Sequence, residues 1–177
     1  MQKSRSESRI VEKTTTPGEF RVGDKAVYPA HGVGEVTAIE NREFSGQTQQ
    51  FYILRILENG MTVMIPTNNI RGLREVISAD KVDRVFEILR GKSLSVDTTT
   101  WNRRYREYME KIKTGSIFEV AEVLRDLYLL KFDKDLSFCE LKLLDTARGL
   151  LLKELAVAQN CDEEAVEEEF RRIFSRQ

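Results

Sequence analysis

Hydrophobic residues alternate with polar ones along the first half of the chain, from about residue 20 to residue 76. This period of two is typical of β-strands, because successive side chains point to opposite faces of a sheet. The pattern predicts four short strands, at residues 25–28, 34–39, 50–56 and 61–65. Turn residues separate them, and Asn59-Gly60 predicts a tight hairpin because both residues tolerate a positive φ. Short antiparallel strands with short turns predict a small Tudor-like (SH3-like) β barrel.

From residue 78 onward the hydrophobic period becomes helical. The first predicted helix begins near Ser78, ends near Gly91 and buries Val82, Val85, Phe86 and Leu89. Three further hydrophobic faces follow: Ile117, Val120, Ala121, Leu124 and Leu127; Leu141, Leu144, Ala147, Leu151 and Leu155; and Val166, Phe170 and Ile173. These faces predict a compact α-helical bundle, and the chain as a whole is expected to be a two-domain α+β protein.

The change of period divides the chain into three parts. Residues 1–18 are rich in Ser, Thr and charge, lack an apolar period and are predicted to be a disordered tail. Residues 19–77 form the predicted Tudor-like domain, and residues 78–177 form the predicted helical domain, with a polar connector at about 91–99. A chain of 177 residues has room for two small cores of this kind.

Composition and charge narrow the functional classes. The chain is 41% hydrophobic and 32% charged, which is ordinary for a folded protein. No stretch approaches the ~20 apolar residues of a membrane span, and the start is polar, so a cytoplasmic protein is expected. The net charge of −1 argues against a protein that coats nucleic acid through bulk charge, so any DNA contact must be local.

The sequence carries no familiar catalytic or metal-binding motif. The only histidine, His31, lies in a Pro-Ala-His-Gly turn without a nucleophile or second metal ligand beside it. Cys139 and Cys161 lack CxxC spacing and are interpreted as helix residues. The acidic run at residues 162–169 lacks the spacing of an EF-hand and is interpreted as a solvated helix face. We therefore expect no enzymatic activity, no metal and no cofactor.

Residues 98–113 combine aromatic and basic side chains. Three threonines precede Trp101 and are placed to cap a helix, and the segment has more basic than acidic residues: Arg103, Arg104, Arg106, Lys111 and Lys113 against Glu107 and Glu110. Guanidinium groups suit phosphate oxygens. However, the large hydrophobic residues recur at helical spacing, as Trp101, Tyr105, Tyr108 and Ile112. Spacing alone favours core packing for Trp101 and leaves an exposed indole wedge as the alternative.

Five segments, in this order, resemble a known family. They are FRVGD at residues 20–24, VYPAHG at 27–32, MIP at 64–66, WNRRY at 101–105 and VAEVLRDL at 120–127. In these the chain resembles the CarD family of bacterial RNA polymerase-binding transcription regulators, which includes CdnL, and the resemblance extends from residue 20 to about residue 158. It implies a Tudor-like domain that adds its sheet to the RNA polymerase β subunit. It also implies a helical domain that touches promoter DNA at the upstream edge of the bubble.

The resemblance also carries over to single residues. Arg42 matches a basic position used against polymerase, and Thr62, Met64, Ile65 and Pro66 fall on the strand that pairs with it. Some members have arginine where Met64 stands, so an apolar contact is expected here. The tryptophan that matches Trp101 wedges into the minor groove in the family, and the adjacent basic positions match Arg103, Arg104 and Arg106. Leu141 occupies the place of a further DNA-facing lysine, for which Lys142 is the nearest substitute.

With the resemblance, the exposed reading of Trp101 becomes the preferred one. The expected function is that of a monomeric transcription regulator that binds the RNA polymerase β subunit and stabilises the promoter open complex, largely independently of DNA sequence. A stand-alone, sequence-specific DNA-binding repressor is the alternative, and it would bind its operator tightly without polymerase. A polymerase-binding module used in repair coupling is a further alternative, disfavoured because the sequence has no ATPase motif.

Overall fold

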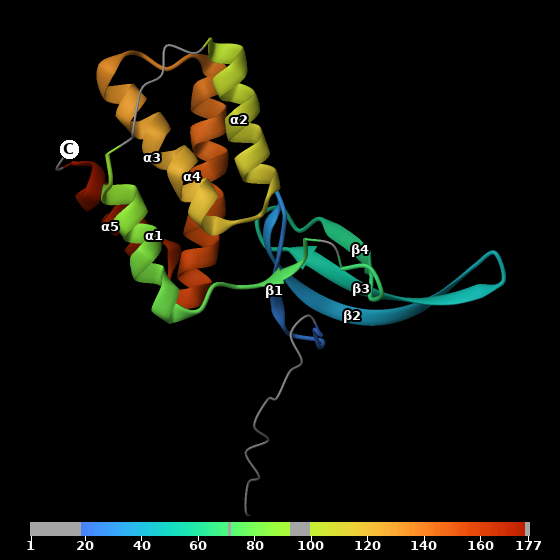
Figure 1. Cartoon of the computed structure of the whole chain (residues 1–177). Coiled ribbons are helices and arrows are strands. Elements are labelled where there is room, and N and C mark those ends of the chain that lie inside the picture. Colours follow the sequence, from blue (N-terminus) through green and yellow to red (C-terminus); the bar gives the residue numbers. More distant parts are fainter. Residues whose placement is uncertain (1–18, 71, 93–99, 176–177) are drawn as a thin grey trace, which may run out of the picture.

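The computed structural model describes residues 19–70, 72–92 and 100–175. Within these residues a five-stranded antiparallel sheet is followed by a helical bundle, and the sheet extends to one side of the bundle (Figure 1). The strands are β1 (Lys25–Tyr28), β2 (Gly32–Phe44), β3 (Gln47–Ile56), β4 (Thr62–Pro66) and β5 (Arg74–Glu75). Their order in the sheet is β4-β3-β2-β1-β5, so β4 and β5 are its edges. The predicted α+β class is confirmed.

The tight turn of the sheet lies in a different hairpin from the predicted one. Ser45 and Gly46 join β2 to β3 with φ angles of 52° and 77°, the pair of positive angles that a two-residue hairpin needs. At Asn59-Gly60 only Gly60 has a positive φ, of 70°. The Asn59 side chain instead accepts a hydrogen bond from the N–H of Met61, at 2.9 Å. The predicted tight turn at Asn59 is therefore wrong, because its side chain closes a longer loop.

The β2–β3 hairpin extends well beyond the other strands (Figure 1). Its register shifts at a bulge between Val36 and Ala38, which strengthens the local twist. One face of the sheet buries a small core made of Phe20, Ala26, Val36, Tyr52, Leu54, Ile56, Ile65 and Leu73. The ring of Phe20 packs edge-on against Tyr52, with centroids 5.8 Å apart. This contact fixes the point at which the chain enters the sheet.

The helical part consists of a short 3-10 turn, η1 (Ala79–Lys81), and the helices α1 (Val82–Arg90), α2 (Trp101–Lys113), α3 (Ile117–Asp133), α4 (Phe138–Gln159) and α5 (Glu163–Phe174). The predicted hydrophobic faces of α1, α3 and α5 are buried throughout. On α4, the predicted face is buried from Leu144 to Leu155, but Leu141 is 42% exposed. The prediction that Leu141 is core is wrong, because it lies in the first turn of α4, at an open end of the bundle (Figure 1).

Several helix ends differ from the predictions. Thr100 occupies the N-cap position of α2, but its side chain makes no capping hydrogen bond, nor does Ser78 at the start of η1. Helix α4 ends at Gln159 because Asn160 adopts a left-handed conformation, with φ 50°. Cys161 therefore follows a helix rather than lying in one. The predicted tail, and residues 93–99 of the predicted connector, lie outside the described residues.

Candidate functional site

The aromatic stripe of α2 divides into a buried half and an exposed half. Tyr108 and Ile112 belong to the bundle core and are 9% and 2% exposed. Tyr105 is 38% exposed, and Trp101 is half-buried at the first position of the helix. The rings of Trp101 and Tyr105 contact each other at a tilt of 54°, with centroids 5.4 Å apart. The two rings thus form one aromatic surface that the core does not absorb.

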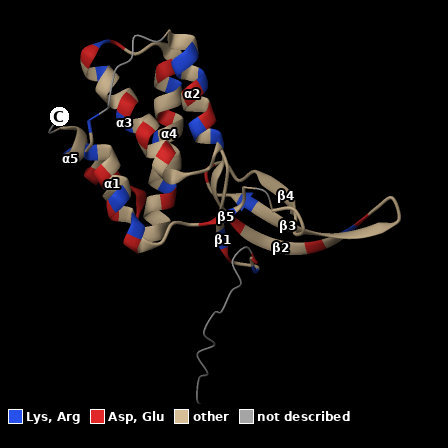
Figure 2. Ribbon diagram, in the orientation of Figure 1, with Lys and Arg blue, Asp and Glu red and all other residues tan. Residues whose placement is uncertain are grey.

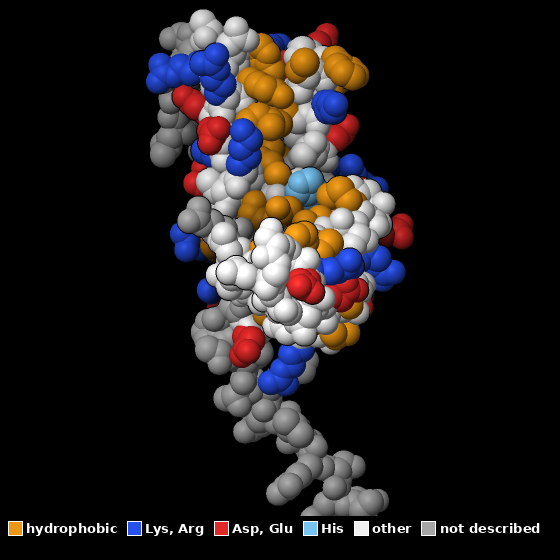
Figure 3. Space-filling model, turned by 90° about the vertical axis from the view of Figure 1, so that its right-hand side faces the viewer, with side chains coloured by type: hydrophobic (Ala, Val, Ile, Leu, Met, Phe, Trp, Pro, Cys, Tyr) orange, Lys and Arg blue, Asp and Glu red, His pale blue; other side chains and the backbone are white. Residues whose placement is uncertain are grey.

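This aromatic surface lies at the end of the bundle that points away from the sheet. Helix α2 begins there, α3 ends there and α4 begins there (Figure 1). Three more large hydrophobic side chains of this end are exposed: Phe132 (60%), Phe138 (80%) and Leu141 (42%). Together with Trp101 and Tyr105 we call them the apolar end. Hydrophobic side chains run in a band from this end of the bundle toward His31 (Figure 3).

Sequence reasoning missed Phe132 and Phe138. Both residues fall off the buried stripes of their helices, at the last turn of α3 and the first residue of α4. The sequence could have indicated both residues. A large aromatic residue at a helix terminus that does not lie on the buried stripe is not expected to pack into the core. The pattern therefore contained two more candidate binding residues than the prediction used.

Polar contacts hold the beginning of α4 in place beside these rings. Ser137 and Glu140 form a reciprocal capping box, and the Glu140 carboxylate also accepts a hydrogen bond from Lys134 Nζ at 3.0 Å. Burial by itself raises the pKa of Glu140, but the hydrogen bonds from Ser137 and the Lys134 ammonium outweigh it and hold the pKa below its usual value. Glu140 therefore remains ionised and fixes the turn that presents Phe138.

The arginines at the start of α2 differ in their exposure and in their hydrogen-bond partners. Arg103 and Arg106 are exposed, and Arg103 Nε lies 3.2 Å from Oε1 of Glu107. Arg104 is half-buried, and in the part of the chain that the structure describes its Nε is buried without a hydrogen-bond partner. Figure 2 shows basic positions in blue along α2. Arg103 and Arg106 are therefore better placed than Arg104 to contact a phosphate.

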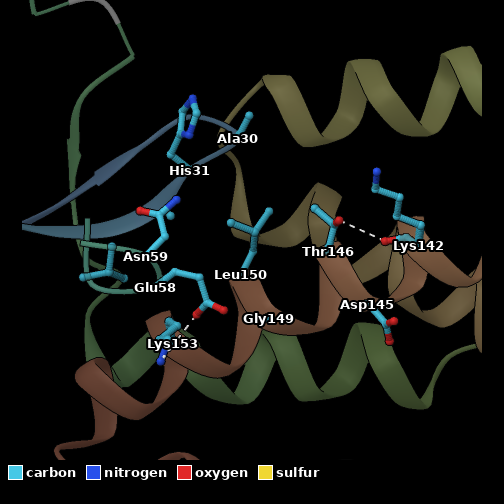
Figure 4. Close-up of a pocket in the computed structure, with 12 residues that line it drawn as sticks. Ala30, His31, Glu58, Asn59, Lys142, Asp145, Thr146, Gly149, Leu150 and Lys153 are labelled. Carbon is cyan, nitrogen blue, oxygen red and sulfur yellow. Dashed lines mark hydrogen bonds and ion pairs between the residues drawn. The ribbon is translucent and has the colours of Figure 1, made fainter. Parts of the chain in front are cut away.

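Lys142 is exposed on α4, but it lines a different feature from the apolar end. It borders a cavity of about 350 Å³ between α4 and the loops of the sheet (Figure 4). His31 lines the same cavity and stacks on Tyr28, with ring centroids 5.4 Å apart. Thr146 donates a hydrogen bond to the Lys142 carbonyl at 2.9 Å. The structure thus places Lys142 on the side of α4 that lines this cavity, at the junction of the two parts.

Strand β4 presents a row of alternating side chains at the edge of the sheet. Thr62 and Met64 are exposed, with Met64 42% exposed, whereas Ile65 is only 5% exposed and belongs to the sheet core. Pro66 is half-buried at the end of the strand. Only Thr62 and Met64 of these residues offer a well-exposed side chain. Ile65 is available to a partner through its backbone alone.

Arg42 lies on the projecting hairpin, next to the same corner of the sheet. It pairs in register with Gln49, whose amide donates to the side chain of Asn68, two residues beyond β4, at 3.0 Å. The Arg42 guanidinium is bound to Glu40, with Nη2 and Oε2 2.7 Å apart. The structure therefore brings Arg42 and the end of β4 to one region, with the charge of Arg42 partly neutralised.

A sheet with an open edge strand, joined to a helical bundle that ends in aromatic and arginine side chains, defines a two-part binding protein. Two family models match the chain: the CarD-like/TRCF RID domain over residues 20–77 and the CarD C-terminal domain over residues 84–171. The chain belongs to the CarD/CdnL family.

The chain is also similar to two known proteins. A Bacillus subtilis (strain 168) protein named "Putative transcription factor YdeB" is 40% identical over 152 residues, which cover 83% of this chain and 97% of that protein. A solved structure titled "CdnLNt from Myxoccoccus xanthus" is 57% identical, covers 38% of this chain and 94% of its own, and has a TM-score of 0.31.

Membership in the family establishes the general role of the chain. It is a transcription regulator, in a family whose members are generally not enzymes, and its CarD-like/TRCF RID domain implies an interaction with RNA polymerase. Among the described residues no three His, Cys, Asp or Glu side chains are grouped to hold a metal ion. No helix in those residues has the length and hydrophobicity needed to cross a membrane.

Proposed function

We propose that the chain binds the β subunit of RNA polymerase through the edge strand β4 and stabilises the promoter open complex through the start of α2. The observation that supports this most is the partly exposed ring pair Trp101–Tyr105, flanked by the exposed Arg103 and Arg106 at the end of the bundle away from the sheet. One surface would hold the polymerase while the other contacts DNA at the upstream edge of the bubble.

The polymerase contact is proposed to form by strand addition. An edge strand offers backbone N–H and C=O groups to a partner strand, and alternate side chains add specificity. Thr62 and Met64 are the exposed side chains on β4, while Ile65 and Pro66 contribute mainly backbone. Met64 makes the contact apolar, and Arg42 adds a charge at its margin.

The DNA contact is proposed to use the rings first and the charges second. An indole beside a helix terminus is suited to wedge against base pairs at a distorted step, and Arg103 and Arg106 are suited to the flanking phosphates. Base stacking on an aromatic ring contributes about 1–3 kcal/mol, which corresponds to roughly tenfold to a hundredfold in the lifetime of the open complex. Base sequence need not be read for this effect.

Two weak contacts are enough because each raises the local concentration of the other. Binding to polymerase places the apolar end close to the bubble, so DNA affinity on its own can be low. The net charge of −1 fits this arrangement better than independent DNA binding. Tight binding to an isolated operator, without polymerase, would favour the stand-alone repressor instead.

The DNA half of the proposal is tested by the lifetime of a promoter open complex after a competitor is added. The wild-type chain is expected to prolong it, and Trp101→Ala to remove roughly tenfold or more of that extension. Trp101→Phe is the matched variant, because it keeps a ring and is expected to retain part of the effect. An unchanged lifetime with folded Trp101→Ala protein would rule out the wedge.

The polymerase half is tested with a charge placed on the strand edge. Met64→Asp is expected to weaken binding to RNA polymerase by about 2–3 kcal/mol, because an unpaired carboxylate would be buried in the contact. Val22→Asp is the control, since Val22 is 60% exposed and precedes β1, away from β4 in the sheet order. Equal binding of the two variants in a pull-down would show that β4 is not the contact.

A further inference from the structure

The turn between β1 and β2 fits tightly between the sheet and the bundle. A Cβ atom built on Gly72 would come within 2.7 Å of Pro29, and one on Gly115 within 3.2 Å of the same ring. A Cβ on Gly32 would lie 3.0 Å from Leu150 of α4. These distances leave no room for side chains, so the turn is seated closely against α4 and the α2–α3 connection. The family-like VYPAHG segment therefore belongs to the joint between the two parts.

An ion pair between a half-buried arginine and a buried carboxylate crosses the same joint. Arg74 of β5 binds Glu154 of α4 with both ends of its fork, Nη1–Oε1 at 2.5 Å and Nη2–Oε2 at 2.8 Å. Arg74 Nε also donates to the carbonyl of Gly115 at 2.8 Å, and the N–H of Ile77 donates to Glu154 at 3.0 Å. Glu154 is only 4% exposed. Four directed hydrogen bonds thus connect the sheet edge, the bundle and the segment between them.

The geometry of this ion pair fixes the relative orientation of the sheet and the bundle more than it increases the stability of the fold. A buried ion pair contributes little net free energy, since desolvation offsets its attraction, but leaving one partner unpaired is costly. A bidentate pair is also satisfied at one relative orientation only. Rotating the sheet against α4 would break the two hydrogen bonds between Arg74 and Glu154 and would leave the buried Glu154 carboxylate without a partner. The joint is therefore built to hold one orientation.

We propose that Arg74 and Glu154 are positioning residues, which fix the angle between the β4 edge and Trp101 so that polymerase and DNA are engaged together. This inference rests on the proposed function. The two surfaces lie on different parts of the molecule and share no residue (Figure 1). Simultaneous binding of polymerase and DNA therefore depends on the joint. The effective concentration of the DNA-binding end near the bubble falls when the angle between the two parts does not allow both contacts at once.

The first measurement reads the joint itself, without polymerase. One spin label is attached to the native Cys139 of the bundle and a second to a Thr48→Cys variant of the hairpin, and Cys161→Ser removes the other native thiol. All three positions are exposed. Pulsed electron paramagnetic resonance then measures the distance between the two labels. A single narrow distance distribution is expected. Arg74→Lys, which keeps the charge but loses the fork, and Glu154→Gln are expected to broaden it. Unchanged narrow distributions in both variants would overturn the inference.

The second measurement reads function. Both variants are expected to keep polymerase binding and to lose roughly tenfold of the open-complex lifetime extension, as the effective concentration of the DNA-binding end falls. Glu58→Gln is the matched control, because the Glu58–Lys153 pair at 3.4 Å crosses the same joint but its carboxylate is exposed (Figure 4). It is expected to behave as wild type. Full activity of Arg74→Lys and Glu154→Gln despite broadened distances would also overturn the inference.

A crosslink separates positioning from direct contact. Glu58→Cys and Lys153→Cys, in a chain with Cys139→Ser and Cys161→Ser, are to be joined by a short bismaleimide, since the native side chains meet at 3.4 Å. The crosslink is expected to restore the lifetime extension to the Arg74→Lys variant and to leave the otherwise native chain active. Failure of this rescue would contradict a positioning role. If even the native chain fails to prolong the open complex, the proposed function fails while the distance measurement still tests the joint.

Discussion

The two halves of α2 carry one hydrophobic repeat but meet different surroundings. The half nearer the sheet places Tyr108 and Ile112 in the bundle core, whereas the half at the far end leaves Tyr105 exposed and Trp101 half-buried. Two of their basic residues differ in the partner they bind. In the half nearer the sheet, Lys111 lies 2.7 Å from Glu122 of the neighbouring helix α3, whereas Arg103 at the far end pairs with Glu107 of its own helix.

A periodic hydrophobic stripe therefore determines the direction in which side chains point, but not whether a neighbouring helix covers them. Spacing places Trp101 and Tyr105 on the same face as Tyr108 and Ile112. What separates them is how far along α2 the bundle still covers that face. An exposed continuation of a core stripe is a natural origin for a binding surface, because the helix that carries it is already anchored.

The largest predicted effect is a difference in folding stability between substitutions in the buried half and in the exposed half of α2. Tyr108→Ala is expected to lower the free energy of unfolding by about 3–5 kcal/mol, as large aromatic truncations in cores do. Tyr105→Ala, on the exposed half, is expected to lower it by less than about 1 kcal/mol. Urea unfolding followed by circular dichroism measures both. Similar losses in the two variants would show that the two halves are not different.

The next prediction concerns Trp101, where stability and function are expected to separate. Trp101→Ala should lower the free energy of unfolding by no more than about 1 kcal/mol, because the half-buried ring leaves a site open to water. The same variant should lose the open-complex effect. A protein that unfolds on this substitution would instead assign Trp101 to the core, as spacing alone suggested.

The fold was largely predictable from sequence, and the helix ends were not. Periods of two and of 3.6 predicted β1 to β4 and the buried faces of α1, α3 and α5, because each period follows from backbone geometry, whereas the two-residue strand β5 is too short to show a period and was missed. Leu141 fits the stripe of α4 yet is exposed, and Phe132 and Phe138 fit no stripe. Their exposure depends on where neighbouring helices stop, which is a tertiary property.

The joint was likewise beyond sequence reasoning. Arg74 and Glu154 are 80 residues apart, and neither residue type predicts burial. The VYPAHG segment was predicted to be a strand end and a turn and was recognised as a family feature, but its packing against Gly72 and Gly115 depends on the fold. The site residues Trp101, Arg103 and Arg106 could be nominated because composition and position drew attention to them. The structure was needed to show which of the basic residues are exposed.

A smaller effect is expected from the charges of the two halves. Arg103→Gln and Arg106→Gln should each reduce the salt dependence of the DNA-bound complex, by about 0.9 in the slope of log affinity against log salt for each phosphate that is no longer neutralised. Lys111→Gln is the matched control, because Lys111 is half-buried and its ammonium lies 2.7 Å from Glu122 of the neighbouring helix α3. An equal change in slope for the arginine variants and for Lys111→Gln would remove the distinction.

The smallest predicted effect lies in the alkaline titration of α2. Burial, reinforced by the nearby carboxylate of Asp126, raises the pKa of Tyr108 from its ordinary value of 10.0 to about 12. Because the folded pKa exceeds the unfolded one, this contribution to stability is complete below pH 10.0 and is lost as the pH rises toward about 12. Tyr108→Phe should therefore flatten alkaline unfolding and reduce the late tyrosinate absorbance step, to which Tyr128 also contributes because burial raises its pKa. An unchanged absorbance step in the Tyr108→Phe variant would contradict the burial of this phenol.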